Sequence, residues 1–259
     1  SLSANTTGEK NTAVGSNALR STTTGPNNTG VGFNALYSTL AGNHNIAVGS
    51  CALYTNVGAD RNTAVGSQAL YTMTGTSDNN NTAVGYSTGK FVTDGICNTF
   101  MGAEAGDNTT TGDNNTTIGF AARSSSATVD NEITLGNGNN DNLRCADTSI
   151  SSLSDLRDKT NIEDIPHGLE YILALRPVKF DWNTRDGTRI GKKDYGFIAQ
   201  ELDQVEETFG NREYTRLVSK ENFDKWETDP MKTYPILIKA IQELSEENKD
   251  LKSRIEALE

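Results

Sequence analysis

A repeat of 17 residues runs through the first half of the chain and restricts its fold more than any other feature. NTAVGSNALRSTTTGPN is one copy and NTGVGFNALYSTLAGNH is the next. The frames begin at Asn11, Asn28, Asn45, Asn62, Asn81, Asn98, Asn115 and Glu132. The step from the frame at 62 to the frame at 81 is longer than the others, because it includes the segment TSDNN. A short repeat at a fixed step predicts a solenoid in which each coil is one repeat.

Each frame carries the pattern of a short strand followed by a corner. The column that begins with Thr12 is always β-branched, and the column of Val14, two residues later, is always aliphatic. Period-2 spacing of such residues is typical of a strand. A glycine follows in every frame, from Gly15 to Gly136, and indicates a turn or a close backbone approach. We therefore predict strand, glycine corner, Ala-Leu segment and polar turn in every coil.

The low apolar content suggests that several chains share one core. Only 34% of residues are hydrophobic and 7% aromatic, and one 17-residue coil offers few side chains to bury. The predicted fold class is a mainly β solenoid, a trimeric β-helix-like shaft in which three chains share an axial core of the Val and Leu columns. The asparagine that opens seven frames either forms a ladder along the rod or belongs to independent surface turns.

The repeat over residues 1–136, with N-x-A-[VI]-G followed by A-L and G, resembles two known repeat classes. These are the head repeats of trimeric autotransporter adhesins and the shaft repeats of phage tail fibres. Because Gly8 lies 17 residues before Gly25, the chain is expected to begin inside a repeat of a longer fibre.

After residue 136 the composition changes, and we expect a linker or final β segment over 137–153. A small α+β domain is predicted over 154–259. It has a short helix at 167–175, a strand at PVKFDW, a hairpin turn at Asp186-Gly187, and a strand that leads into a helix over 194–205.

The last 24 residues show the spacing of a coiled coil, over about 236–259. Apolar residues alternate in steps of four and three, and one asparagine interrupts them, as polar residues at seam positions do to fix the register. The seam is Leu237, Ile241, Leu244, Asn248, Leu251, Ile255 and Leu258.

The motif SDLRDK over 154–159 admits a structural and a chemical interpretation. Ser154 could cap a short turn, Thr160 and Glu163 fit a capping box, and Lys159 could be a solvated charge. A separation of five residues puts Ser154 and Lys159 on different sides of a helix or strand. Only a turn between them could join them as nucleophile and base.

SDLRDK, GLEYILALRPVKFDW, GFIAQEL and LIKAIQEL together resemble the intramolecular chaperone domain of endosialidases and other phage tail spikes. Related self-cleaving domains occur in membrane-anchored transcription factors of animals. The resemblance implies a trimer that cuts itself at Leu153–Ser154, with Ser154 as nucleophile and Lys159 as base. Asp155 and Arg157 match the motif as supporting residues whose roles stay undetermined.

Charge and composition argue against several other function classes. Residues 1–150 hold six basic and eleven acidic side chains, and 151–259 hold 17 and 23, so neither half favours binding to nucleic acid. There is no apolar run long enough for a membrane span. Three dispersed cysteines do not suggest a disulfide framework, and His44 and His167 suggest no metal centre. No cofactor is expected.

The predicted function is therefore a tail fibre segment whose C-terminal chaperone drives trimerisation and then releases itself in a single turnover. The expected partners are two further copies of the chain, other tail proteins and a host cell-surface glycan or receptor, and the expected location is the virion tail after folding in the host cytoplasm. The alternative is a glycan-binding or glycan-degrading adhesin that retains its C-terminal domain. Tyr37, Tyr54 and Tyr71 share one column and form either a sugar-stacking stripe or a packing element.

Overall fold

A computed structural model shows two compact units, Ser1–Asp141 and Asn142–Glu259, which we call the shaft and the C-terminal unit. The structure describes residues 1–76, 78–140, 142–146, 154–185, 187, 189–210, 212–220, 222 and 224–258.

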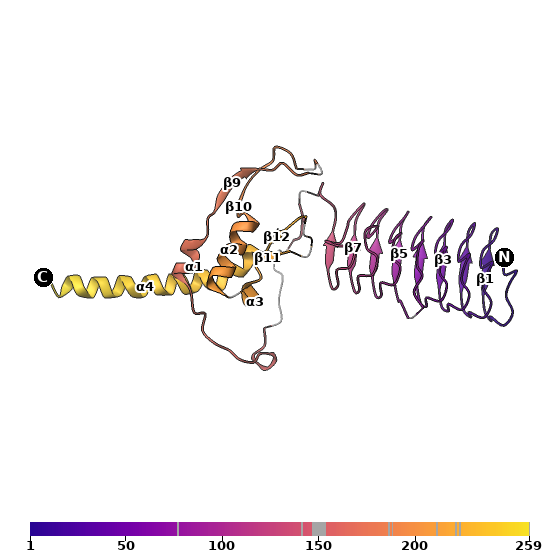
Figure 1. Ribbon diagram of the computed structural model, residues 1–259, viewed down its shortest axis with the longest axis horizontal. Helices are drawn as coiled ribbons and strands as arrows, with labels where there is room; N and C mark the ends of the chain where they lie inside the picture. Colours follow the sequence, from indigo (N-terminus) through magenta and orange to yellow (C-terminus); the bar gives the residue numbers. More distant parts are fainter. Residues whose placement is uncertain are drawn as a thin grey trace. The chain divides into compact units, whose positions relative to one another are not determined.

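The shaft is a solenoid with one three-residue strand in each frame (Figure 1). Neighbouring strands pair in parallel and in chain order, with Thr12 opposite Thr29 and Val14 opposite Val31. This confirms the predicted strands and coils. The strands are β1 (Thr12–Val14), β2 (Thr29–Val31), β3 (Ile46–Val48), β4 (Thr63–Val65), β5 (Thr82–Val84), β6 (Thr99–Met101), β7 (Thr116–Ile118) and β8 (Ile133–Leu135).

Each coil buries a core of its own. The middle residue of a strand faces inward, as buried Ala47 and Ala64 do, and the leucine column packs against it from another wall. Those leucines, Leu19, Leu36, Leu53 and Leu70, are fully buried within a single chain. The prediction that three chains share the Leu column is therefore wrong. The inward-facing alanines are small, so the leucine side chains of the same chain fill the interior of the coil. The Val column faces outward.

The glycine corner after each strand needs glycine for two reasons. From Gly15 to Gly119 its φ lies between 122° and 140°, which side-chain-bearing residues rarely adopt. In addition, a Cβ at Gly32 would lie 2.5 Å from the carbonyl oxygen of Gly49 in the next coil. The corners therefore stack backbone against backbone.

The asparagines that open the frames form a buried ladder, which decides between the two interpretations of this column. The Oδ1 of Asn28 accepts a hydrogen bond from the backbone N–H of Asn45 at 2.9 Å, and its Nδ2 donates to the carbonyl of Gly42 at 2.7 Å. The bond from a backbone N–H to the Oδ1 of the asparagine one frame earlier recurs along the shaft up to the N–H of Glu132. Each side chain thus satisfies backbone groups that would otherwise be buried without partners.

A phenylalanine side chain fills the shaft core where the leucine column ends. The leucine position holds Gly89 and Gly106 in the fifth and sixth frames, and the inward strand position of the sixth frame holds Phe100 instead of alanine. The Phe100 ring is fully buried, and a Cβ at Gly89 would lie 2.8 Å from it. The ring therefore occupies the space that two leucine side chains leave.

The C-terminal unit is a small α+β assembly, as predicted. Its helices are η1 (Leu156–Asp158), α1 (Leu169–Ala174), α2 (Ala199–Phe209), α3 (Arg212–Thr215), η2 (Pro230–Thr233) and α4 (Tyr234–Glu256). Its strands are β9 (Val178–Asp181), β10 (Lys193–Gly196), β11 (Val218–Ser219) and β12 (Glu227–Thr228), in two antiparallel pairs, β9 with β10 and β11 with β12. The predicted short helix, the strand at PVKFDW and the strand leading into α2 are all confirmed.

The core of this unit joins helices that are far apart in the sequence. Tyr171 of α1, Leu202 of α2 and Ile236 of α4 are all buried in one cluster. The N-terminus of α1 is closed by α4, because the backbone N–H of Leu169 donates to Oε2 of Glu243 at 2.6 Å. The first turns of α4 thereby belong to the globular part of the unit.

Three predicted features differ or lie outside the described residues. Of the predicted linker or final β segment, residues 137–140 and 142–146 contain no strand, and 141 and 147–153 lie outside the described residues. Asp186 of the predicted hairpin turn is likewise outside them. The long helix begins at Tyr234 and ends at Glu256, so Leu258 lies beyond it.

Candidate active site

A single turn of helix, η1, gives the SDLRDK motif its shape. Asp155 is its N-cap and accepts a hydrogen bond from the backbone N–H of Arg157 at 2.9 Å. At the other end the N–H of Lys159 donates to the carbonyl of Leu156 at 3.2 Å. Both flanking residues have extended backbones, so the chain enters and leaves the turn as a tight bend. Asp155 caps this turn rather than Ser154.

This bend brings together the two residues that the motif proposes as nucleophile and base. The Nζ of Lys159 lies 2.6 Å from the Oγ of Ser154 and donates a hydrogen bond to it. That distance is within the range over which a base can take the hydroxyl proton. The turn overcomes the separation that a regular helix or strand would impose. Leu153, the other residue of the candidate cleavage site, lies outside the described residues.

Asp155 and Arg157 form an ion pair across the same turn. Nε of Arg157 donates to Oδ1 of Asp155 at 3.0 Å, and NH2 donates to Oδ2 at 2.7 Å. These side-chain bonds, with that of the Arg157 backbone N–H, lower the pKa of the Asp155 carboxyl. The same ion pair raises the pKa of the Arg157 guanidinium. The Asp155 carboxylate therefore bonds to both the backbone and the side chain of Arg157 across the bend.

Solvent reaches the whole motif in a single chain. Ser154, Lys159 and the turn between them are exposed. A lysine amine accepts a proton only when it is neutral, and burial is the usual means of stabilising that form in proteins. One chain alone therefore supplies the geometry of the pair but does not shield it from water.

The neighbouring polar residues have structural contacts. His167 pairs with Glu170 in the first turn of α1, and its ring meets the edge of Phe209 at 5.2 Å between centroids. No helix begins at Thr160, so the predicted capping box with Glu163 is wrong. Residues that the sequence analysis missed include Glu243, whose bond to Leu169 spans 74 positions and leaves no local signal.

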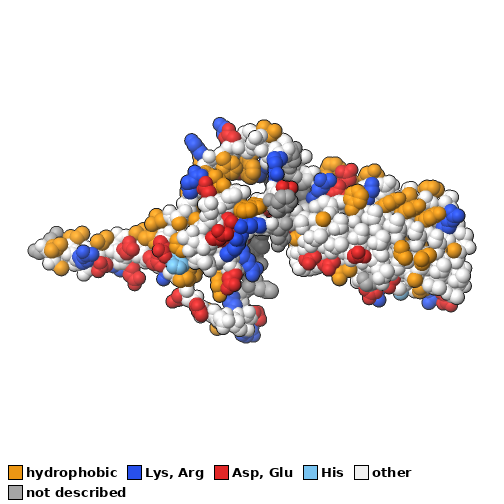
Figure 2. Space-filling model, in the orientation of Figure 1, with side chains coloured by type: hydrophobic (Ala, Val, Ile, Leu, Met, Phe, Trp, Pro, Cys, Tyr) orange, Lys and Arg blue, Asp and Glu red, His pale blue; other side chains and the backbone are white. Residues whose placement is uncertain are grey.

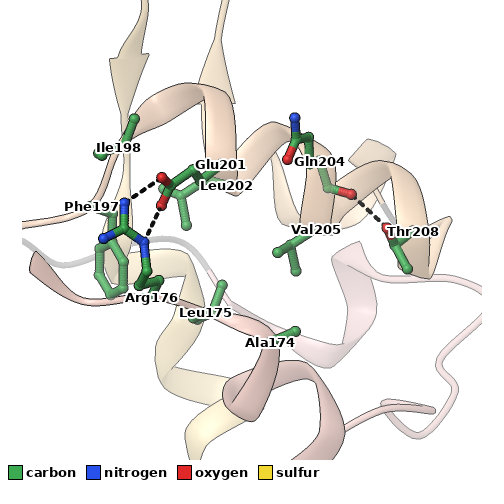
Figure 3. A pocket seen from close by; sticks show the side chains of 10 residues that line it. All are labelled: Ala174, Leu175, Arg176, Phe197, Ile198, Glu201, Leu202, Gln204, Val205 and Thr208. Atoms are coloured by element: carbon green, nitrogen blue, oxygen red, sulfur yellow. Dashed lines mark hydrogen bonds and ion pairs between the residues drawn. The ribbon is translucent and has the colours of Figure 1, made fainter.

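A separate hollow of about 350 Å³ lies beside α2 (Figure 3). Its walls come from the end of α1, from the segment after β10 and from one face of α2. Its two ionisable lining groups, Arg176 and Glu201, pair with each other, with Arg176 Nε 2.9 Å from Glu201 Oε2. Their hydrogen bonds raise the pKa of Arg176 and lower that of Glu201. The hollow offers neither a nucleophile next to a base nor a pair of free carboxylates.

The tyrosine column on the shaft is a stack. The rings of Tyr37, Tyr54 and Tyr71 lie parallel, with centroids 5.1 and 5.0 Å apart. A sugar stacks on the face of an aromatic ring, and here both faces of Tyr54 are covered by its neighbours. Arg20 lies over Tyr37 at 5.5 Å from the ring centroid. These contacts favour packing as the role of the column.

Residues 154–211 match the family model described as the chaperone of endosialidase. Together with the β-solenoid shaft, this match fits a phage tail fibre that carries an endosialidase-type chaperone domain. The Ser154–Lys159 contact lies at the very start of the matched chaperone segment. Searches for similar curated proteins and for similar solved structures found no match.

The described part of the chain has no group of three or more His, Cys, Asp or Glu side chains arranged to hold a metal ion. Among the same residues no helix is both long and apolar enough to cross a bilayer.

Proposed function

We propose that the chain is a tail fibre segment whose chaperone domain assembles three copies and then detaches by cutting the Leu153–Ser154 bond. The contact of 2.6 Å between Lys159 Nζ and Ser154 Oγ carries this proposal, because it places a base beside a nucleophile within the chaperone match. As a tail fibre segment, the protein would be located in the virion tail after folding in the host cytoplasm.

The reaction that fits this arrangement is an acyl shift followed by hydrolysis. Ser154 Oγ attacks the carbonyl carbon of Leu153 while Lys159 Nζ takes the hydroxyl proton. The C–N bond then breaks, the proton passes to the departing amino group of Ser154, and an ester links Leu153 to Oγ. Water hydrolyses the ester, which leaves a carboxylate on Leu153 and a free hydroxyl on Ser154. No external substrate needs a binding site.

Assembly would control this reaction through burial. The pair is exposed in one chain, and the neutral form of the lysine is favoured when neighbouring copies exclude water from it. Cleavage would then occur only after three chains have assembled. The shaft would remain as product, and the chaperone would leave.

The test is intact-mass analysis of freshly folded protein. The wild type should give fragments of 153 and 106 residues, as the cut after Leu153 requires. Ser154→Ala should give one intact chain that still assembles, because the exposed hydroxyl is needed for chemistry and not for packing. A wild-type chain that stays whole after prolonged incubation as a verified trimer would show that the domain is a retained chaperone.

The seam of α4 should be required for assembly. Ile241, Leu244, Leu251 and Ile255 are 47–66% exposed in the single chain, which leaves an apolar stripe along the helix. Replacing both Leu244 and Leu251 by serine should therefore lower the yield of soluble trimer, measured by light scattering. Serine at exposed Glu246 and Lys249, off the seam, is the matched control. An unchanged yield in the seam variant, or a wild-type mass near the 27.9 kDa of one chain, would contradict the assembly role.

A further inference from the structure

Three columns of the repeat carry no charged residue in any of the eight frames. They are the two outward positions of each strand and the position just after the glycine corner, and we call them together the strand face. The first column is Thr12, Thr29, Ile46, Thr63, Thr82, Thr99, Thr116 and Ile133. The second is Val14, Val31, Val48, Val65, Val84, Met101, Ile118 and Leu135. The third is Ser16, Phe33, Ser50, Ser67, Tyr86, Ala103, Phe120 and Asn137.

Charges are confined to the remaining columns. Residues 1–140 contain fourteen acidic or basic side chains, and all fourteen lie outside the strand face. Arg61 and Asp78, for example, form an ion pair at the turn that precedes the strands. In the space-filling view, hydrophobic side chains form patches along the shaft (Figure 2).

The strand face also collects the exposed apolar side chains of the shaft. Among the described shaft residues fourteen large hydrophobic side chains are exposed, and eleven of them are in these three columns. They are Val14, Phe33, Ile46, Val48, Val65, Tyr86, Met101, Ile118, Phe120, Ile133 and Leu135. Contiguous apolar surface of this kind is unusual on a monomer and marks a place of contact.

The size of this face indicates that it acts together with another contact. Eight coils are separated by seven spacings of ~4.8 Å along the shaft, and the three columns span four residue steps along the chain. The strand face therefore measures ~34 by ~13 Å, or roughly 450 Å². A standard interface buries about 800 Å² on each partner. The strand face alone therefore falls short, and a second contact between the same partners is needed.

A second copy of the chain offers a matching surface for each contact. Its strand face has the same rise per coil, so aliphatic rows on two parallel shafts meet layer by layer along the whole length. Its α4 offers the same exposed seam, from Ile241 to Ile255, for the second contact. An uncharged, periodic surface gives a charged or irregular partner little to recognise.

We infer that the strand faces of parallel copies pack against one another and form the core between the chains of the shaft. This inference rests on the proposed assembly and specifies which surface joins the copies. It leaves the leucines inside each chain and places only the Val14 column and its flanking columns between chains.

Cysteine cross-linking tests this placement. In the full chain with Cys51, Cys97 and Cys145 replaced by serine, Val65→Cys puts a thiol on the strand face. Val57→Cys is the matched control, because Val57 is 38% exposed and Val65 is 36% exposed, but Val57 lies outside the three columns. A short bis-maleimide, followed by intact-mass analysis, should join most Val65→Cys chains into covalent pairs and few Val57→Cys chains.

The outcomes separate this inference from the proposed function. A trimer in which Val57→Cys cross-links and Val65→Cys does not would overturn the strand face and leave assembly and cleavage intact. A trimer in which both variants cross-link equally would also reject it, because the contact would not be confined to one face. A monomer by light scattering would overturn both proposals.

Discussion

Replacing Lys159 by arginine is expected to slow self-cleavage by at least ~10²-fold, since a guanidinium keeps its proton and cannot act as a base. Arginine retains a positive charge and a donor that can reach Ser154 Oγ, so the substitution separates base catalysis from simple anchoring of the hydroxyl. The rate is measured as loss of intact chain by mass spectrometry in samples whose trimeric state has been verified.

Two companion variants make this result specific. Lys159→Met should be as slow as Lys159→Arg, because both remove the base. Lys193→Met alters an exposed lysine on β10 and should cut at the wild-type rate. Cleavage of Lys159→Arg at the wild-type rate would mean that Lys159 only holds the serine in place, and the assigned base would be wrong.

The shaft could be predicted from its sequence because its pattern repeats. Eight copies of the same alternation identify the strands, and the glycine after each strand identifies the corner. The inside and outside of the coil were harder to assign. Leu19 and Leu53 have φ near 50°, a left-handed conformation that leucine rarely adopts, and this directs the leucines into their own chain. No propensity argument anticipates such a backbone.

The sequence predicted which residues form the candidate site but not how they are arranged. The motif pointed to Ser154 and Lys159, but their contact depends on a turn of three residues that Asp155 caps. The pairing of Asp155 with Arg157 also needed the structure, because two residues at this spacing face apart in a regular helix and the sequence did not indicate the turn that joins them. The cap that Glu243 supplies to α1 joins distant segments and has no local signature.

The replacement of two leucines by one phenylalanine can be recognised only when neighbouring repeats are compared together. Gly89, Phe100 and Gly106 each look like a defect when their frames are compared singly with the others. Together they conserve volume, because the Phe100 ring lies where the leucines of two layers would otherwise be. Interiors are packed closely enough that such a gap is not left empty.

Phe100→Ala is accordingly expected to destabilise the middle of the shaft by about 3–5 kcal/mol, since it opens a cavity in a fully buried site. Hydrogen exchange measured by mass spectrometry on peptides from β5 to β7 reports this loss as faster local opening. Phe91→Ala is the control, because Phe91 is 48% exposed and lies off the strand face. Its effect should stay within about 0.5 kcal/mol.

Restoring the leucines should then recover the lost protection. Gly89 and Gly106 have φ of 57° and 64°, close to the 47–52° of the leucines in the first four frames, so leucine fits their backbone. The triple variant Phe100→Ala, Gly89→Leu, Gly106→Leu recreates the alanine-leucine core of those frames. Gly106→Leu by itself should destabilise by about 1–3 kcal/mol, because it overpacks against the intact ring. If the triple variant were as unprotected as Phe100→Ala, the ring would have a role in the shaft other than filling the space of the missing leucines.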